Sequence, residues 1–454
     1  SDPRDFTEIN GTLVFSANGA NGREPWVTDG SVAGTSEMVD LNPGAASSNP
    51  DEFVVMGSEL WFSATQSGFG NEVFRTDGTA SGTSIVIDAV PGGGSLSASG
   101  LTPFGSQLLF RGSLNAGVQE PCITDGTTLG TFLLDDLAPP VSDSTPRLFA
   151  DLGSEVFFIA SGDLVGFEPY KTDGTIAGTS LIADLSSGGG GSGTNYVATR
   201  GSDVFFEATV GGSENLYVTD GTTPVQLTFA GEAPRAITTL GNLVVFSGNS
   251  SGTGREPWVS DGTTAGTFEL LDLQPGSASG IPFFGEDFTA AGGLIFFTGS
   301  DGTHGRELWA TDGTTAGTYM VADLQVGSGS ANPDDLIEYQ GELFFKVSVS
   351  GLGSELWKSD GTVAGTVLVV DLRPGLVGSN PDNMTVANGL LYMTANGGSG
   401  TQIWSSDGTA AGTTMITTGG AGQLTPYREL TATTAGVFFL HDGGTNTGLE
   451  LWLT

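Results

Sequence analysis

One acidic phrase recurs along the chain and holds most of its candidate chemistry. It reads Glu-Leu-Trp-Ala-Thr-Asp-Gly-Thr at Glu307–Thr314, with close variants elsewhere. An aspartate before glycine can accept hydrogen bonds from turn N–H groups, or it can bind calcium together with nearby carbonyls. Calcium needs about six to eight oxygens, and no Asp-x-Asp-x-Asp-Gly loop is present, so the pattern favours a structural turn. The calcium candidates are Asp29, Asp77, Asp125, Asp173, Asp220, Asp261, Asp312, Asp360 and Asp407.

Glutamate and an aromatic residue recur at the start of the same phrase. A carboxylate copied in nearly every repeat indicates a structural hydrogen-bond acceptor, because an active site is unique. The glutamates are Glu24, Glu72, Glu120, Glu168, Glu256, Glu307, Glu355 and Glu450. The aromatic position holds Trp26, Trp258, Trp309, Trp357, Trp404 and Trp452, and elsewhere Phe74, Cys122, Tyr170 and Tyr217. Since cysteine cannot stack on a sugar, packing is the favoured role of this position.

Residues outside the phrase offer few catalytic combinations. His304 and His441 lie in separate repeats without zinc spacing, and Cys122 occupies a core position of its repeat. A carboxylate pair for glycoside hydrolysis stays open, although a solvated channel wall is favoured. The candidate carboxylates are Glu8, Asp151, Glu286, Asp287 and Glu338. The arginines that a sialidase-type site would need are scattered over Arg4, Arg147, Arg200, Arg235 and Arg428.

The period of the repeat predicts the elements that position these residues. Successive repeat aspartates are 48, 48, 48, 47, 41, 51, 48 and 47 residues apart. Each period contains four short segments rich in β-branched and aromatic residues, bounded by Gly, Pro, Asn or Asp. Three examples are Asp51–Val55, Leu343–Phe345 and Thr366–Leu372. None has a helical period, and four strands in about 40–50 residues are typical of a propeller blade.

The number of strand copies predicts the number of blades. The second and third segments each occur ten times and the fourth occurs nine times. We therefore expect an all-β fold, a β-propeller of about ten four-stranded blades in a single ring over residues 1–454, the last blade with three strands. The fifth repeat, from Asp220, lacks the second Gly-Thr and Asp-Leu pairs. Two five-bladed propellers, at residues 1–240 and 241–454, are the alternative.

The composition excludes several classes of partner. The chain has 454 residues, 14 Lys+Arg against 51 Asp+Glu, and a net charge of −37, which repels nucleic acids and anionic membranes. Its single cysteine forms no intrachain disulfide, and no apolar stretch of about 18 residues could span a membrane. The chain begins at Ser1 rather than Met, so we expect a processed product.

The phrases at Glu307–Thr318 and Glu355–Thr366 resemble the bacterial ELWxxDGT repeat family, and the resemblance covers almost the whole chain. It implies exported proteins, often at the cell surface, without a common biochemical activity. The Asp-Gly turn also resembles the Asp-box hairpin of sialidase-like propellers, which is structural and does not imply sialidase activity. The departures are Asn215 and Gln402 at the glutamate position, Cys122 at the tryptophan position, and the fifth repeat.

The regularity of the sequence favours a non-catalytic extracellular or cell-surface protein, a binding or assembly module with a protein or glycan partner. One alternative is a carbohydrate-active enzyme with its site in the central channel. Another is a multivalent lectin with equivalent pockets between blades. Calcium is the one cofactor that the residues suggest. A local function should lie where the repeat fails: the fifth unit from Thr219 to Leu240, the last blade and the variable loops.

Overall fold

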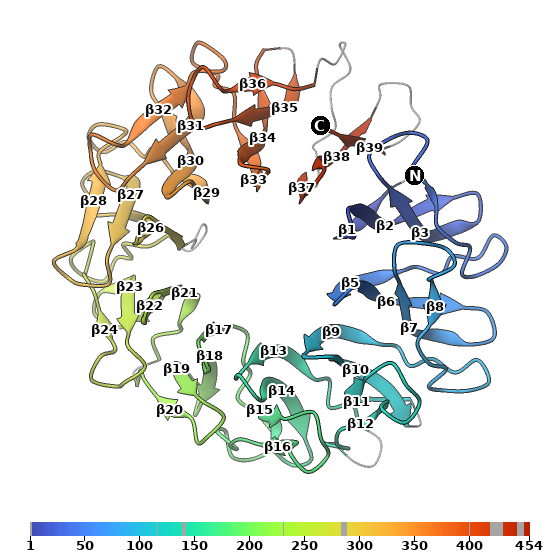
Figure 1. The fold of residues 1–454 in the computed structure, drawn as a ribbon. Coiled ribbons are helices and arrows are strands. Elements are labelled where there is room, and N and C mark those ends of the chain that lie inside the picture. Colours follow the sequence, from blue (N-terminus) through green and yellow to red (C-terminus); the bar gives the residue numbers. More distant parts are fainter. Residues whose placement is uncertain are drawn as a thin grey trace. The chain divides into compact units, whose positions relative to one another are not determined.

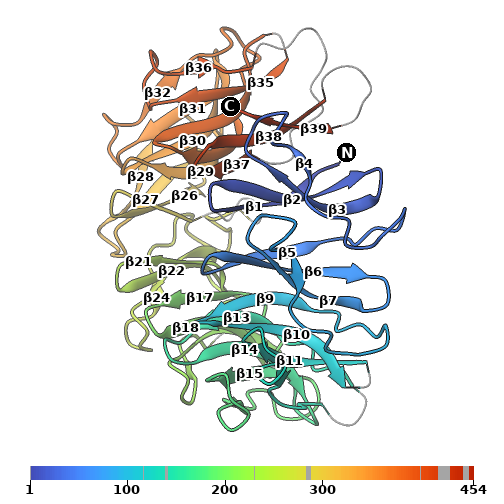
Figure 2. The ribbon, with the colours of Figure 1, turned by 45° about the vertical axis from the view of Figure 1, so that its right-hand side comes forward.

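The computed structural model describes residues 2–115, 117–138, 142–229, 231–282, 288–398, 400–417, 430–442 and 449–454. Strands are the only regular elements in these ranges, and they form ten sheets, nine with four strands and one with three. Within every sheet, strands that follow each other in the chain are neighbours (Figures 1 and 2). This is the order of a propeller blade. The fold is a β-propeller of ten blades, which confirms the fold that the repeat predicts.

The first two strands of each blade form a tight hairpin. The first strands are Arg4–Ile9 (β1), Asp51–Met56 (β5), Ser99–Phe104 (β9), Arg147–Asp151 (β13), Val197–Arg200 (β17), Arg235–Leu240 (β21), Thr289–Ala291 (β25), Asp334–Tyr339 (β29), Asp382–Ala387 (β33) and Leu430–Thr433 (β37). The second strands are Thr12–Gly19 (β2), Glu59–Gln66 (β6), Gln107–Asn115 (β10), Val156–Gly162 (β14), Asp203–Val210 (β18), Leu243–Ser250 (β22), Leu294–Ser300 (β26), Glu342–Val349 (β30), Leu390–Asn396 (β34) and Gly436–Asp442 (β38).

The third strands contain the repeated glutamate and aromatic residue. They are Gly22–Thr28 (β3), Gly70–Thr76 (β7), Val118–Thr124 (β11), Gly166–Thr172 (β15), Ser213–Thr219 (β19), Gly254–Ser260 (β23), Arg306–Thr311 (β27), Gly353–Ser359 (β31), Thr401–Ser406 (β35) and Leu449–Leu453 (β39). The fourth strands are Ser36–Glu37 (β4), Ser84–Ile85 (β8), Phe132–Leu133 (β12), Ser180–Leu181 (β16), Val225–Gln226 (β20), Phe268–Glu269 (β24), Thr318–Ala322 (β28), Val367–Val370 (β32) and Thr414–Met415 (β36).

The fourth strands are shorter than the sequence suggests. The expected segment Thr35–Leu41 pairs with β3 only at Ser36 and Glu37. Beyond this pair, the chain leaves the ladder so that Leu41 N–H reaches the carboxylate of Glu24. The fifth blade has its fourth strand, β20, although its repeat lacks the second Gly-Thr pair.

The contacts of the chain define two compact units. Unit 1 comprises residues 1–193, 221–223 and 433–454, and unit 2 comprises residues 194–220 and 224–432. In unit 1, β1 contacts β5, β5 contacts β9 and β9 contacts β13. In unit 2, the first strands from β17 to β33 contact one another in the same succession. First strands therefore lie against the first strands of neighbouring blades, while fourth strands form the outer edges of their sheets.

The second strands supply most of the core. They are apolar on both faces because blades pack against both of their sides. In unit 1, Phe62, Phe110, Phe157 and Phe158 are fully buried. The blades of unit 2 bury the corresponding phenylalanines, Phe205, Phe206, Phe246, Phe296, Phe297, Phe344 and Phe345. This confirms the packing role of the most apolar segment of each repeat.

A β-bulge recurs in the first strands and re-aims their side chains. The register of β29 on β30 shifts between Asp334 and Ile337, and Asp335, in the bulge, has a φ of 53°. The equivalent residues of other blades also have positive φ: Asp5, Glu52, Gly100, Leu148, Ala236 and Asn383. Because these residues are mostly not glycine, the sequence contains no signal for the bulge.

The C-terminal strands of unit 1 pack beside its first blade. Thr434 N–H donates to the Glu8 carboxylate at 2.8 Å. Leu453 lies against Gly30, whereas the Trp452 side chain is 47% exposed. The sheet β37–β38–β39 has three strands, as the strand count predicts. No helix in the described ranges is both long and apolar enough to cross a membrane.

Candidate functional site

The repeated aspartates clamp the turn between the third and fourth strands. In the turn that Asp312 opens, its Oδ1 accepts the Thr314 N–H at 2.8 Å and the Thr314 hydroxyl at 2.7 Å. The same pair of bonds, to Ser31 or to the threonine two residues on, occurs at Asp29, Asp77, Asp125, Asp173, Asp261, Asp360 and Asp407. Asp220 opens the shortened turn of the fifth blade. The turn-clamp interpretation is confirmed for Asp312 and for the seven other aspartates that make this pair of bonds.

Hydrogen bonding within the turn lowers the pKa of exposed aspartates such as Asp77 and Asp360. The hydroxyl and N–H of Thr362 lower the pKa of Asp360, and the same cause lowers the pKa of Asp77 through Thr79. Since the described residues contain no group of three or more carboxylate, histidine or cysteine side chains that could hold a metal ion, a cation at these turns would need backbone carbonyls. Calcium binding at these turns stays a prediction.

The second glycine of the turn leaves room for the carboxylate of the aspartate. A Cβ at Gly317 would overlap the carboxylate of Asp312. We expect Gly317→Ala to displace Asp312 and lower the free energy of unfolding by about 1 kcal/mol, the value of one or two exposed turn hydrogen bonds. Chemical denaturation would measure it. Gly252→Ala is the matched control, because a Cβ at Gly252 meets nothing within 4 Å. Equal stability of the two variants would contradict this role of Gly317.

The repeated glutamates are buried acceptors for the segment that leaves each blade. Glu307 is 0% exposed, and its two carboxylate oxygens accept the N–H groups of Leu324 at 2.8 Å and Ala331 at 3.2 Å. Equivalent pairs of bonds occur at Glu24, Glu72, Glu120, Glu256 and Glu355. Glu168 also accepts two backbone N–H groups, from the adjacent residues Leu185 and Ser186. The structural role that the sequence favours is thereby confirmed for seven blades; the side chain of Glu450 lies outside the described residues.

The departures from the repeat preserve this acceptor. Asn215 Oδ1 accepts Gly231 N–H at 3.2 Å, and Gln402 Oε1 accepts the Thr417 hydroxyl at 2.8 Å. At the neighbouring aromatic position, Trp309 is 6% exposed and its ring is stacked on Phe297 at 6.5 Å between centroids. Cys122 is fully buried there, and burial raises the pKa of its thiol far above its usual range. In the described blades other than the last, the residue at the aromatic position of the third strand therefore packs against its neighbours.

The candidate carboxylates of a channel site are held separately, each by its own neighbourhood. Asp151 accepts Gly153 N–H at 2.6 Å, Glu338 accepts Gly341 N–H at 2.7 Å, and Glu8 accepts Thr434 N–H. Each bond fixes a turn next to a first strand. Glu286, Asp287 and Arg428 lie outside the described residues.

The candidate arginines are likewise engaged locally. Arg200 pairs with Asp203 at 2.8 Å, Arg235 with Glu214 at 3.3 Å, and Arg4 with Asp5 at 3.8 Å. Arg147 lies over the ring of Phe167 at 4.4 Å. Among the described residues, these arginines form local pairs rather than one cluster, so the expectation of a sialidase-type arrangement receives no support from them.

The histidines occupy unrelated places. His304 Nδ1 lies 2.7 Å from Asp301 Oδ2, and this hydrogen bond raises the pKa of His304. The contact closes the loop before β27, where Asp301 Oδ1 also accepts two N–H groups. The side chain of His441 lies outside the described residues.

One charged cluster in unit 2 was not recognised from the sequence. Lys346 Nζ on β30 lies 3.2 Å from Asp334, 3.5 Å from Asp335 and 3.9 Å from Asp382. Asp382 belongs to the next blade, on β33. Desolvation and the hydrogen bond to Asp382 raise the pKa of Asp335, while the same bond lowers the pKa of Asp382. The cluster therefore joins two blades through one ammonium group and a proton-sharing pair of carboxyl groups.

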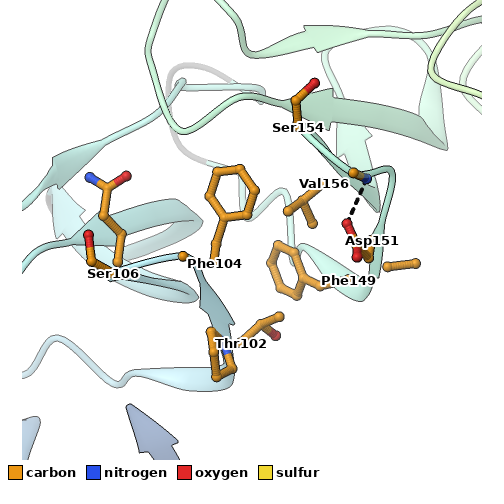
Figure 3. A pocket seen from close by; sticks show the side chains of 12 residues that line it. Thr102, Phe104, Ser106, Phe149, Asp151, Ser154 and Val156 are labelled. Atoms are coloured by element: carbon orange, nitrogen blue, oxygen red, sulfur yellow. Dashed lines mark hydrogen bonds between the residues drawn. The ribbon is translucent and has the colours of Figure 1, made fainter. Parts of the chain in front are cut away.

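A cleft of about 520 Å³ lies between blades 3 and 4 of unit 1 (Figure 3). Its walls are the β9–β10 and β13–β14 hairpins. Tight turns position them: Gly105 has a φ of 60° and Gly153 a φ of 87°, values that favour glycine. The rings of Phe104 and Phe149 lie in the middle of the cleft, and Asp151 is at one side (Figure 3). Of the candidate carboxylates, Asp151 is thus the one that lines this cleft.

Comparison with known proteins gives no family. No family model matches the chain, and no curated protein matches it. Among solved structures, the tricorn protease is 15% identical, with a TM-score of 0.28, over 99% of this chain and 43% of that chain. The β-propeller domain of the Trilobed protease from Pyrococcus furiosus is 9% identical, with a TM-score of 0.33, over 81% of this chain and 95% of that chain. This chain therefore spans less than half of the tricorn protease chain, and its function has to be argued from its own residues.

Proposed function

We propose that the chain is a non-catalytic propeller that binds a glycan outside the cell, at a bacterial surface. One observation carries this proposal: the repeated carboxylates are consumed by structural hydrogen bonds. In Glu256, both oxygens accept backbone N–H groups of the same blade, at 2.9 and 2.6 Å. In Asp261, the Oδ1 accepts both the N–H and the hydroxyl of Thr263. Groups held in this way build the scaffold of each blade.

The remaining surface supports binding rather than group transfer. Asp151 and Glu338 each stabilise a turn of their own blade, the fourth and the eighth, whereas a glycosidase needs its two carboxyl groups together. The extracellular location rests on the resemblance to exported ELWxxDGT repeat proteins. The net charge of −37 favours solubility and disfavours nucleic acid as the partner.

A binding assay combined with a turnover assay tests the proposal. The purified chain would be applied to an array of bacterial and host glycans, and the retained glycans would then be analysed for new reducing ends or unsaturated products. We expect retention of one class of glycan without any change in its length. Release of shortened products would overturn the non-catalytic role. Retention only by surface proteins would replace the glycan with a protein partner.

A further inference from the structure

The cleft between blades 3 and 4 combines apolar rings with polar groups in a way that the repeat does not explain. Phe104 ends β9 at a position where the first, second and fourth blades have Ile9, Met56 and Leu152. Asp151 precedes that position in blade 4, where blade 2 has Val55. These substitutions occur side by side, on the two walls of one cleft. In unit 1, Phe104 is the departure from the other blades, whereas Asp151 has a counterpart in Glu8 and Phe149 has counterparts in Phe6 and Phe53.

The two aromatic rings provide a partly exposed apolar floor. Phe104 and Phe149 both pack on the core formed by Leu109, Ile123, Leu134 and Val156. Each ring is only half-buried, so one part of it faces the core and another part faces the cleft. Apolar packing on one side holds the rings in place, and the exposed part can stack on the C–H face of a sugar ring.

Polar groups surround these rings. Ser106 and Ser154 are exposed at the two hairpin turns (Figure 3). Gln107 also lines the cleft. Asp151 uses Oδ1 for Gly153 N–H, at 2.6 Å. Hydroxyl and amide groups can both donate hydrogen bonds to sugar hydroxyls and accept hydrogen bonds from them. A carboxylate can only accept. A cleft of about 520 Å³ lies within the range of small-molecule sites.

The charge of the cleft restricts the class of sugar. None of its described lining residues is basic, and Asp151 is acidic. The whole chain has a net charge of −37, so sialylated, sulfated or uronic-acid ligands would be repelled both locally and at long range. A saccharide without charged groups avoids this penalty.

We propose that this cleft binds a neutral saccharide, with one ring on Phe104 and Phe149 and its hydroxyls bonded to Asp151, Gln107 and the two serines. The inference rests on the proposed glycan-binding function and adds the site and the ligand class. It does not require an equivalent pocket in blade 8, which has Glu338 and Tyr339 at the same two positions, because Tyr339 is buried and its hydroxyl donates to Gly389 O.

The test uses neutral oligosaccharides of hexoses and N-acetylhexosamines, with sulfated and sialylated counterparts, and measures Kd by titration calorimetry. Phe104→Leu removes the ring but keeps an aliphatic side chain that other blades have at this position. We expect its Kd to be about tenfold higher, the loss of one stacking contact. Met56→Leu, at the same position of blade 2, is the matched control and should bind like the wild type.

A blocking variant keeps the test independent of stability. Ser154 is exposed at the cleft, so Ser154→Arg should prevent binding without disturbing the core, whereas Ser202→Arg, at the same turn of blade 5, should not. Anionic counterparts should bind more weakly than neutral sugars, with a difference that shrinks as salt rises. If a sugar binds Ser154→Arg and Phe104→Leu like the wild type, the cleft is wrong while glycan binding stands. If no neutral sugar binds the wild type, the inference is wrong, and the array decides the proposed function separately.

Discussion

Replacing Lys346 with methionine is expected to lower the free energy of unfolding by about 2–3 kcal/mol at pH 8, measured by urea denaturation. The Lys346 side chain is 15% exposed, and its ammonium lies within 4 Å of three carboxylates from two blades. Desolvation acts to lower the pKa of Lys346, but Asp335 and Asp334 outweigh it and raise that pKa. Methionine keeps the aliphatic volume and removes the cation, so the carboxylates are left to repel one another. The expected loss is below that of a fully buried pair because Asp334 and Asp382 are partly exposed.

The effect of Lys346→Met should depend on pH. The folded-state pKa of Asp335 is already raised, so the contribution of Asp335 to stability is present at acid pH and is lost as pH rises through that pKa. Without the cation this pKa rises further, and the deficit of the variant should be smaller at pH 5 than at pH 8. Lys358→Met is the matched control: its partner Glu342 lies 2.8 Å away, both side chains are partly exposed, and the cost should stay below about 1 kcal/mol. If the two variants lost the same free energy of unfolding, the cluster would not hold blades 8 and 9 together.

Replacing Glu256 with alanine is expected to cost about 3 kcal/mol, because the buried N–H groups of Leu273 and Gly280 both lose their side-chain acceptor. Glu256 is fully buried, so no bulk water is in contact with these donors in the native blade. Thermal and urea denaturation would measure the loss. Glu269→Ala, on the outer strand of the same blade, serves as the control, since Glu269 accepts only the Thr253 hydroxyl. A loss no greater than that of the control would refute the role of Glu256.

Glu256→Gln keeps the shape of the side chain and removes its titrating carboxyl group, so it isolates the effect of charge on stability. Burial raises the pKa of Glu256 to about 8, so its favourable contribution is complete below about pH 4.5 and is lost as pH rises through about 8. Glutamine does not titrate, so the stability of this variant should lack that slope. The deficit relative to the wild type should therefore be larger at pH 5 than at pH 9. A deficit that is constant over this range would mean that Glu256 does not titrate there.

These predictions distinguish the two kinds of polar group in the molecule. Glu256 and its equivalents make bonds that close within a single repeat, and they occur in seven blades. Lys346 contacts a carboxylate of the neighbouring blade, and Asp151 lines a cleft between two blades. Substitutions of the first kind should affect stability, and substitutions at the cleft should affect ligand binding with little change in stability.

The sequence by itself determined the number of blades, the order of their strands and the role of the repeated Asp and Glu. The reason is that these features are local. The clamp of Asp312 spans only the residues of one turn, and the acceptor role of Glu307 is completed before the next repeat begins. A pattern of apolar segments and glycine turns therefore contains all the information that they need. The sequence overestimated the length of the outer strands: after β4, Leu41 N–H donates to the buried carboxylate of Glu24 and not to a strand carbonyl.

Only the tertiary structure decided which non-repeated residues meet. Lys346 reaches Asp382, and Phe104 shares a cleft with Phe149, because neighbouring blades pack in a definite register. The positive φ of Asp335 and its equivalents, in the bulges of the first strands, likewise has no residue signature. Side chains that belong to different blades have no fixed spacing in the chain, so a periodic pattern cannot place them. The candidate site therefore became visible only once the blades were packed together.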